Sequence, residues 1–164
     1  MLKKIGVVGI DLDNLRSKFG SHALSLSGNN FGNILFTSAI YRQIPGCQHL
    51  GFLFDPQKAR TELDHIVIPA ANWINHTEDW GFLADLIEKV DLPVCVVGLG
   101  SQLPDLDAAK DVPNGTVRFL KEVSKRSATI GVRGKFTQEI LKKLGFSNTV
   151  ALGCPSIFST NMAP

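Results

Sequence analysis

The sequence has few cysteines, no cluster of charge and no long apolar run. Its three cysteines, Cys47, Cys95 and Cys154, are far apart and lack the paired spacing of a zinc site, so reduced thiols in the cytosol are the simplest interpretation. The lysines and arginines are spread along the chain and the net charge is +2. This pattern argues against nucleic acid as a partner and against binding to a membrane surface.

The N-terminus lacks the features of a targeting segment. Two lysines precede apolar residues in "MLKKIGVVGIDLD", but the apolar part is short and stops at Asp11. A strand or a disordered leader is therefore a better interpretation than a secretory signal. No segment approaches the roughly 20 apolar residues needed to cross a bilayer. We expect a soluble, cytoplasmic protein without a membrane span.

The chain does contain enough apolar sequence for a core. With 164 residues, of which 44% are hydrophobic and 20% charged, we expect residues 1–164 to form a single domain. Several short, β-branched segments are nearly continuous in apolarity, as in strands buried on both faces of a parallel sheet. The strands predicted in this way are residues 65–72, 93–100, 128–133 and 149–153. Cys95, inside one of them, is expected in the core.

Helical patterns occupy the segments between these strands, at residues 77–91, 116–126 and 135–145. Glu78 and Asp79 suit the first turn of the first of these helices. In the last helix, Phe136, Ile140 and Leu144 are expected to face the core. Strands and helices that alternate with short connections predict an α/β fold, a Rossmann-like three-layer sandwich with a mostly parallel, doubly wound sheet.

A glycine- and asparagine-rich segment, "SGNNFGNILF" (residues 27–36), leads into an apolar run. Glycine permits unusual backbone angles, and asparagine accepts hydrogen bonds from the free amides at a helix start. The segment predicts a turn followed by a helix over residues 28–43, whose N-terminus would suit a phosphate or carboxylate. Residues 49–54 form a further expected strand, residues 1–26 carry no assignment, and the polar loop 104–115 could cover a site.

Polar and small residues follow the predicted strands. Because parallel sheets bind ligands at the carboxyl ends of their strands, we expect these residues to gather along one rim, joined by the asparagine-rich turn. The residues expected there are Asn72, His76, Gly100, Ser101, Gln102, Arg133 and Cys154, with Asn29 and Asn30 from the turn.

Two of these positions have competing interpretations. The planar fork of Arg133 could bind a carboxylate or phosphate, or it could form a surface ion pair. The glycines of "GLGSQ" (98–102) could let a ligand approach backbone amides, or they could serve a tight turn of the fold. This segment is not a dinucleotide fingerprint, because Leu103 stands where G-x-G-x-x-G has its last glycine.

Other chemistry-bearing side chains are also ambiguous. His76 could transfer protons or simply be solvated in a loop. Asp11 and Asp13 could bind a metal together with nucleotide phosphates, although two carboxylates alone are a weak metal signal, and no metal site is predicted. Trp73 and Trp80 could stack against a sugar ring or fill the edge of the core.

Three segments together resemble the polysaccharide pyruvyl transferase family. They are "SGNNFGNILFTSAIYRQI" (27–44), "LPVCVVGLGSQ" (92–102) and "SATIGVRGKFTQEILKKLGFSNTVALGCPSIF" (127–158). Their order along the chain is that of the family. The last segment is the most specific, because it joins a strand, an arginine, a helix, a "KLG" end and a "GCPS" turn.

The resemblance implies a two-lobed transferase with Rossmann-like lobes. Such enzymes move the pyruvyl unit of phosphoenolpyruvate onto two hydroxyls of a sugar, as a cyclic ketal on a cell-surface polysaccharide, and need no redox cofactor. Cations must hold the carboxylate and phosphate of the donor. Arg133 matches the arginine of the family's strand-arginine-helix motif. The resemblance therefore implies that Arg133 binds the donor. Asn29, Gly32 and Asn33 match the N-terminal glycine-asparagine turn of the family. The resemblance implies that this turn contacts an anion or the substrate.

The sequence departs from the family at two points. Asn33 stands where many members carry an aspartate, which argues against a metal-binding or acid role at that position. Members are also considerably longer, so this chain is expected to be the N-terminal lobe, with the site completed by a second lobe or by a homo-oligomer. Two alternatives stay open: a glycosyltransferase-like module that binds a nucleotide sugar, and a noncatalytic lobe whose cleft face is an interface.

Overall fold

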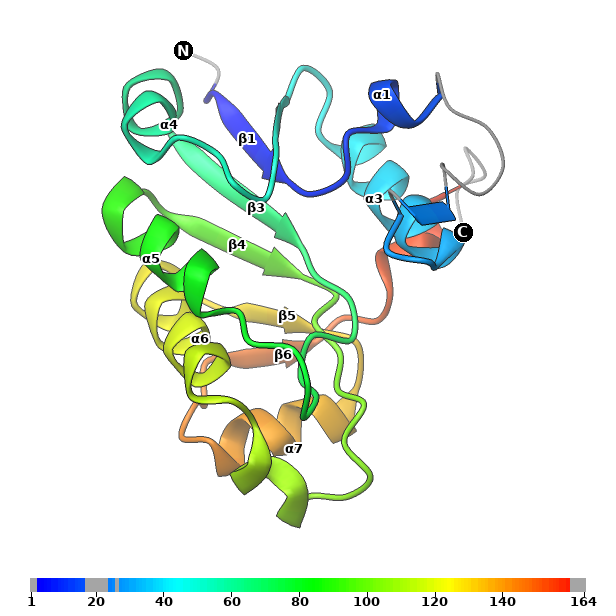
Figure 1. Ribbon diagram of the computed structural model, residues 1–164, viewed down its shortest axis with the longest axis vertical. Coiled ribbons are helices and arrows are strands. Elements are labelled where there is room, and N and C mark those ends of the chain that lie inside the picture. Colours follow the sequence, from blue (N-terminus) through cyan, green and yellow to red (C-terminus); the bar gives the residue numbers. More distant parts are fainter. Residues whose placement is uncertain (1–2, 17–23, 26, 160–164) are drawn as a thin grey trace.

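The structure, a computed structural model, describes residues 3–16, 24–25 and 27–159 (Figure 1). Six strands are present in these residues: β1 (Ile5–Val8), β2 (Gln48–Leu50), β3 (His65–Pro69), β4 (Val94–Val97), β5 (Ile130–Val132) and β6 (Thr149–Ala151). The helices are α1 (Leu12–Arg16), α3 (Phe31–Gln43), α4 (Pro56–Glu62), α5 (Gly81–Val90), α6 (Asn114–Arg126) and α7 (Lys135–Lys143), with short 3₁₀ helices η1 (Asp107–Asp111) and η2 (Pro155–Phe158).

All strand pairs are parallel. Four strands form a sheet in the order β2-β1-β3-β4, and β5 pairs with β6. A parallel bridge between Leu99 and Val132 joins the two sets just beyond β4. Strand β1 has β2 on one side and β3 on the other, so the winding direction reverses between β1 and β3. Open parallel sheets bind ligands at such a switch point, outside the carboxyl ends of the strands.

Helices cover the sheet on both faces. On one face, α4, α5 and α6 bury alternate residues of the strands, including Ile66, Ile68 and Val96, in the main hydrophobic core. On the other face, Val7 and Val67 pack against Ile40 of α3 in a smaller cluster. The fold prediction is confirmed: this is an α/β protein with a parallel sheet between helices, consistent with a Rossmann-like fold.

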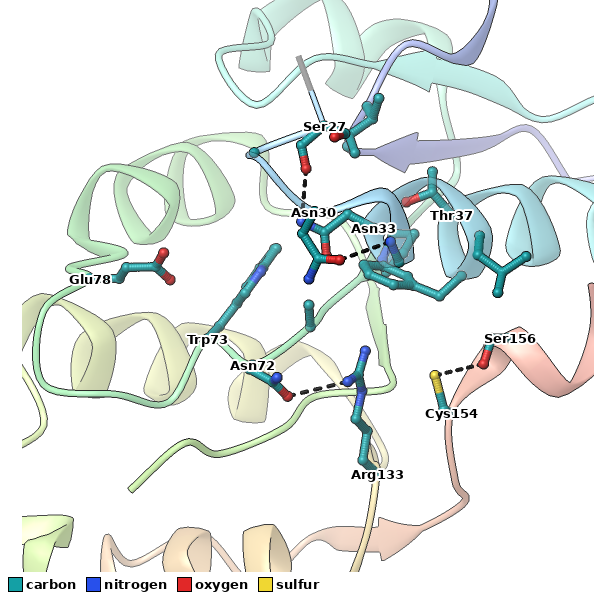
Figure 2. A pocket seen from close by; sticks show the side chains of 18 of the residues that line it. Ser27, Asn30, Asn33, Thr37, Asn72, Trp73, Glu78, Arg133, Cys154 and Ser156 are labelled. Carbon is teal, nitrogen blue, oxygen red and sulfur yellow. Dashed lines mark hydrogen bonds between the residues drawn. The ribbon is translucent and has the colours of Figure 1, made fainter. Parts of the chain in front are cut away.

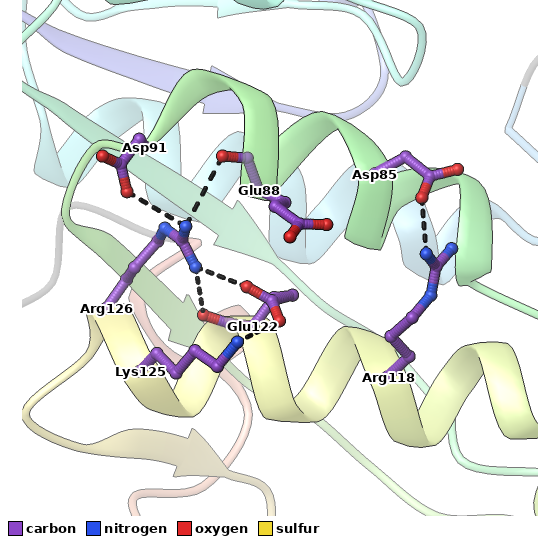
Figure 3. Close-up of polar contacts among 7 residues, drawn as sticks. All are labelled: Asp85, Glu88, Asp91, Arg118, Glu122, Lys125 and Arg126. Atoms are coloured by element: carbon purple, nitrogen blue, oxygen red, sulfur yellow. Dashed lines mark hydrogen bonds and ion pairs between the residues drawn. The ribbon is translucent and has the colours of Figure 1, made fainter.

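Polar contacts reinforce the packing of α5 against α6 (Figure 3). Arg118 Nη1 lies 2.6 Å from Asp85 Oδ1 at one end of the helix pair. At the other end, Arg126 contacts both Asp91 and the buried Glu122, at 3.0 and 2.6 Å. Lys125 Nζ also donates to Glu122, at 2.5 Å.

The chain after β6 crosses back to α3. Helix η2 packs against α3, and Arg42 Nη1 of α3 donates a hydrogen bond to the carbonyl of Ser159. Gly98 has a φ of +77°, and a Cβ there would lie 2.7 Å from Pro155 Cδ. A glycine at 98 is therefore required both by the turn and by the close approach of η2.

Most predicted elements are present, but two side chains are placed differently from expectation. Phe136 was expected to face the core and is 41% exposed. The stripe that α7 turns inward consists of Thr137, Ile140, Leu141 and Leu144, at the spacing i, i+3, i+4 and i+7, so Phe136 falls outside it. Cys95 was expected in the core and is exposed, because the alternation of β4 turns Val94 and Val96 toward the main cluster and Cys95 to the opposite face.

Segment boundaries also differ from the predictions. The strands end earlier than expected, at Leu50, Pro69 and Val97, and α5 begins after Glu78 and Asp79. The predicted turn and helix over 28–43 are confirmed, with α3 beginning at Phe31 after the turn. Of the unassigned residues 1–26, residues 5–8 form the strand that was one alternative to a leader, and 1–2, 17–23 and 26 lie outside the described residues. No helix in the described parts of the chain is long and apolar enough to traverse a membrane.

Candidate functional site

A cavity of about 620 Å³ lies at the switch point of the sheet (Figure 2). Each wall comes from a segment that follows a strand or begins a helix. Gly9 and Ile10 follow β1, Ala71 and Asn72 follow β3, and Arg133 follows β5. The remaining lining residues are Ser25, Ser27, Gly28, Asn30, Gly32, Asn33, Leu35, Phe36, Thr37, Phe52, Pro69, Trp73, Glu78, Trp80, Gln102, Cys154 and Ser156.

The N-terminus of α3 forms one wall. Asn30 is the N-cap, and its Oδ1 accepts a hydrogen bond from the amide of Gly32 at 2.8 Å. A Cβ at Gly32 would lie only 2.9 Å from that oxygen, so glycine leaves room for the cap. Asn33 Nδ2 donates to the carbonyl of Ser27 at 2.9 Å and fixes the preceding turn. The positive end of the α3 dipole therefore faces the cavity.

Arg133 is held by the protein rather than paired with a carboxylate. Its Nε donates to the carbonyl of Gly98 at 3.0 Å, and its Nη1 donates to Asn72 Oδ1 at 3.2 Å. The guanidinium carbon lies 5.6 Å from the centre of the Phe36 ring. The described residues thus engage two of its five N–H groups and orient the rest. The ion pairs among the described residues do not include Arg133.

The glycines of segment 98–102 serve the packing of the fold. A Cβ at Gly100 would lie 2.5 Å from Asn72 Oδ1 and 3.1 Å from Arg133 Cδ. Gly100 therefore makes room for the Asn72–Arg133 pair without lining the cavity itself. The amides from Leu99 to Leu103 all donate to protein acceptors, at 2.7 to 3.2 Å. These contacts favour the tight-turn interpretation over a cradle of amides for a ligand.

Seven of the residues predicted at the site line the cavity together: Asn30, Gly32, Asn33, Asn72, Gln102, Arg133 and Cys154. The other four, Asn29, His76, Gly100 and Ser101, are not among the lining residues. Ser101 Oγ donates to the carbonyl of Ile74 at 3.2 Å and so supports the loop. His76 is exposed in the loop after β3, and its catalytic role stays a prediction. No residue of the loop 104–115 lines the cavity, and Ala108, Ala109 and Val112 anchor that loop in the core.

Glu78 is a lining residue that the sequence pattern did not single out. The sequence suggested a place in the first turn of a helix, but the carboxylate precedes α5 and reaches the cavity. Asn75, which is 8% exposed, donates from Nδ2 to Glu78 Oε2 at 3.2 Å and accepts from the Glu78 amide at 2.8 Å. The spacing of an asparagine three residues before a glutamate, in the loop between a strand and a helix, is the signal that could have found it.

The two tryptophans pack against each other. Trp73 and Trp80 are stacked, with ring centres 4.0 Å apart and an interplanar angle of 19°. Phe52 lies 6.1 Å from both. Trp73 is 7% exposed and belongs to the main core, as the packing interpretation expects, yet all three rings line the cavity.

The acidic pair near β1 has a structural role. Asp11 Oδ1 accepts hydrogen bonds from the amides of Asp13 and Asn14, at 3.0 and 2.9 Å, at the start of α1. The bond from Asn14, with His49 nearby, holds the pKa of Asp11 below its ordinary value. No group of three or more potential metal-binding side chains occurs within the parts of the chain that the structure describes.

The protein is thus an α/β protein with a cavity at the switch point of a parallel sheet, the place where such folds bind small molecules. The chain belongs to the polysaccharide pyruvyl transferase family, whose model matches residues 2–164, essentially the whole chain. Searches of curated proteins and of solved structures gave no match. Family membership indicates a transferase-like function with a saccharide acceptor.

Proposed function

We propose that the protein transfers the pyruvyl group of phosphoenolpyruvate to a saccharide, as a ketal, in cell-surface polysaccharide biosynthesis. The observation that carries the proposal is the family match over essentially the whole chain. The cavity at the switch point supports it, because its volume of about 620 Å³ suits a small donor together with part of a sugar.

The reaction has simple requirements. The methylene carbon of the enol gains a proton, two sugar hydroxyls form bonds to the neighbouring carbon, and the bond from that carbon to the phosphate oxygen breaks. One hydroxyl proton balances the proton gained by the methylene, and the other leaves with phosphate or solvent. The enzyme must therefore hold a carboxylate and a phosphate while charge develops on the leaving group.

Arg133 is our candidate for donor binding. Asn72 and Gly98 fix its guanidinium plane, and its remaining N–H groups can donate in parallel to a carboxylate or phosphate. The positive end of α3 adds to the favourable potential for an anion.

We further propose that residues 1–164 form one Rossmann-like domain that acts as the N-terminal lobe of a two-lobed transferase. The donor carries two anionic groups, whereas Arg133 is the only lysine or arginine among the described lining residues. A second cationic surface facing this cavity would balance the remaining charge.

The direct test is calorimetric titration of the full-length protein with phosphoenolpyruvate, followed by measurement of phosphate release when saccharides are added. Arg133→Ala should weaken donor binding by roughly 10- to 100-fold, since a hydrogen bond to a charged group contributes about 1.5–3 kcal/mol. Arg60→Ala, an exposed arginine on α4, is the matched control and should bind normally. Unchanged donor affinity in Arg133→Ala would refute the assigned role, and absence of donor binding to the unaltered protein would refute the function.

A further inference from the structure

One wall of the cavity is made of aromatic rings and a single carboxylate. Phe52, Trp73 and Trp80, together called the aromatic wall, all line the cavity. Trp73 and Trp80 are stacked at 4.0 Å, and Phe52 lies 6.1 Å from each. The wall is therefore a rigid apolar surface rather than a set of independent side chains.

One polar group on this wall can meet a ligand. Glu78 is the only carboxylate among the described lining residues, and Asn75 orients it through Oε2. Trp80 contributes apolar ring surface to the wall, because its indole Nε1 is buried.

The anion-binding features lie elsewhere in the cavity. Figure 2 shows Glu78 on the side of Trp73 that is away from Arg133 and Cys154. Among the described lining residues, Arg133 is the cation of the cavity and Glu78 is its anion. An anionic donor is attracted to Arg133 and repelled from Glu78, so the two ends of the cavity favour different chemistry.

A sugar ring matches the aromatic wall. One face of a pyranose presents C–H groups that pack against aromatic rings, and its rim presents hydroxyls that donate to a carboxylate. We propose that the aromatic wall and Glu78 form the saccharide-acceptor subsite, and that this subsite selects a neutral sugar because Glu78 repels an acidic one. The proposal rests on the proposed function for the role of the sugar as acceptor, but binding can be tested by itself.

The protein supplies its own probe, because its two tryptophans are both in the aromatic wall. The full-length protein is titrated with the methyl glycosides of glucose, galactose and mannose, and with methyl glucuronide, while tryptophan emission is recorded. We expect a saturable change with at least one neutral glycoside and weaker binding of the glucuronide than of the glucoside. The absence of a saturable change with every neutral glycoside would overturn the proposal.

Variants of the wall sharpen the test. Glu78→Gln should weaken binding of the neutral glycoside by roughly tenfold, and it should remove the discrimination against the glucuronide. Trp80→Phe keeps an aromatic ring but reduces the apolar surface of the wall, and it should also weaken binding, as measured by calorimetry. Phe136→Ala, an exposed aromatic on α7 outside the cavity, is the control and should leave the titration unchanged. Unchanged sugar affinity in Glu78→Gln would refute the role of the carboxylate.

A separate titration with phosphoenolpyruvate distinguishes this inference from the proposed function. Donor binding without binding of any neutral glycoside would refute the acceptor subsite and leave the function standing. Binding of a neutral glycoside without donor binding would support the saccharide subsite and count against pyruvyl transfer.

Discussion

The two faces of the sheet use their side chains differently. The face covered by α5 and α6 is closed by a continuous core that includes Phe119, Leu83 and Ile130, and by ion pairs between the two helices. The face covered by α3 has only a small apolar cluster around Val7 and Val67 among the described residues. Beside it, the cavity contains polar side chains whose hydrogen-bonding groups face open space.

Because of this difference, we expect the residues that stabilise the fold to be different from the residues that bind a ligand. Side chains between α5 and α6 satisfy one another, so their replacement should lower the free energy of unfolding and leave ligand affinity in the folded protein unchanged. Side chains around the cavity have room for an additional partner, so their replacement should change affinity more than stability. Four substitutions test this separation, and their expected effects on stability decrease from the first to the last.

The largest loss is expected for Phe119→Ala. Phe119 is a fully buried residue of α6 whose ring lies 5.9 Å from that of Trp73, and removing a buried phenylalanine side chain costs about 3–5 kcal/mol. Phe136→Ala, an exposed position on α7, should change stability by less than about 0.5 kcal/mol. Urea denaturation measures both. A large loss of phosphoenolpyruvate affinity in the folded Phe119→Ala protein would break the separation of the two faces.

Glu122→Gln should have the next largest effect. Burial alone would raise the pKa of Glu122, but hydrogen bonds from Lys125 and Arg126 outweigh it and lower the pKa below 4.5. Loss of these charged hydrogen bonds should cost about 2–3 kcal/mol at neutral pH. Glu139→Gln, which replaces a glutamate on α7 outside this cluster, is the control.

The pH dependence of the Glu122 effect has a definite sign. Because the folded-state pKa is lowered, the stability contributed by Glu122 is present above pH 4.5 and is lost as the pH falls through the folded-state pKa. The difference between the native protein and Glu122→Gln should therefore shrink on acidification, in denaturant titrations repeated across the acidic range. A difference that stays constant with pH would show that the charge is not responsible.

Gly100→Ala should affect both stability and donor binding, because Gly100 packs against the Asn72–Arg133 pair. The added Cβ would lie 2.5 Å from Asn72 Oδ1 and displace the Asn72–Arg133 pair. We expect a loss of about 1–2 kcal/mol in stability from overpacking, and weaker phosphoenolpyruvate binding because Arg133 moves. At Gly51 an added Cβ would meet no described atom within 4 Å, so Gly51→Ala should affect neither quantity. Normal donor affinity in Gly100→Ala would show that the orientation of Arg133 is unimportant.

The smallest stability change is expected at the N-caps. Asn30→Ala removes the cap of α3 and Asp55→Ala removes that of α4, each at a cost of about 1 kcal/mol. Because only Asn30 of these two lines the cavity, only its replacement should also lower phosphoenolpyruvate affinity. Equal donor affinity in the two variants would indicate that the start of α3 does not contact the ligand.

Much of the fold could be predicted because it depends on local patterns. Continuous apolar segments identified the strands from residue 65 onward, and the glycine- and asparagine-rich turn identified the start of α3. The strand-end rule also placed Arg133, Asn72 and Gln102 at one edge of the sheet. The switch point was not predicted, since the order of β1, β2 and β3 depends on pairing between distant segments.

The rest of the cavity and of the packing was missed for specific physical reasons. Phe136 is excluded from the buried stripe of α7 because Thr137 and Leu141 share that stripe with Ile140. Trp73 and Trp80 meet because the loop after β3 folds back onto the start of α5, and no local pattern encodes that contact. Glu78 is a residue type that is common in the first turn of a helix. Only its contacts with Asn75 distinguish that position from the place in the cavity wall that it occupies.

The return of η2 to α3 has a consequence for biosynthesis. Arg42 and Ser159, which are joined by a hydrogen bond, are 117 positions apart in the chain, and Cys154 and Ser156 line the cavity just before Ser159. On the ribosome, the asparagine-rich turn emerges long before these residues, so the pocket stays unfinished until residues 154–159 have been made. A small-molecule ligand of this pocket can stabilise the newly made protein only after η2 has been translated and has docked.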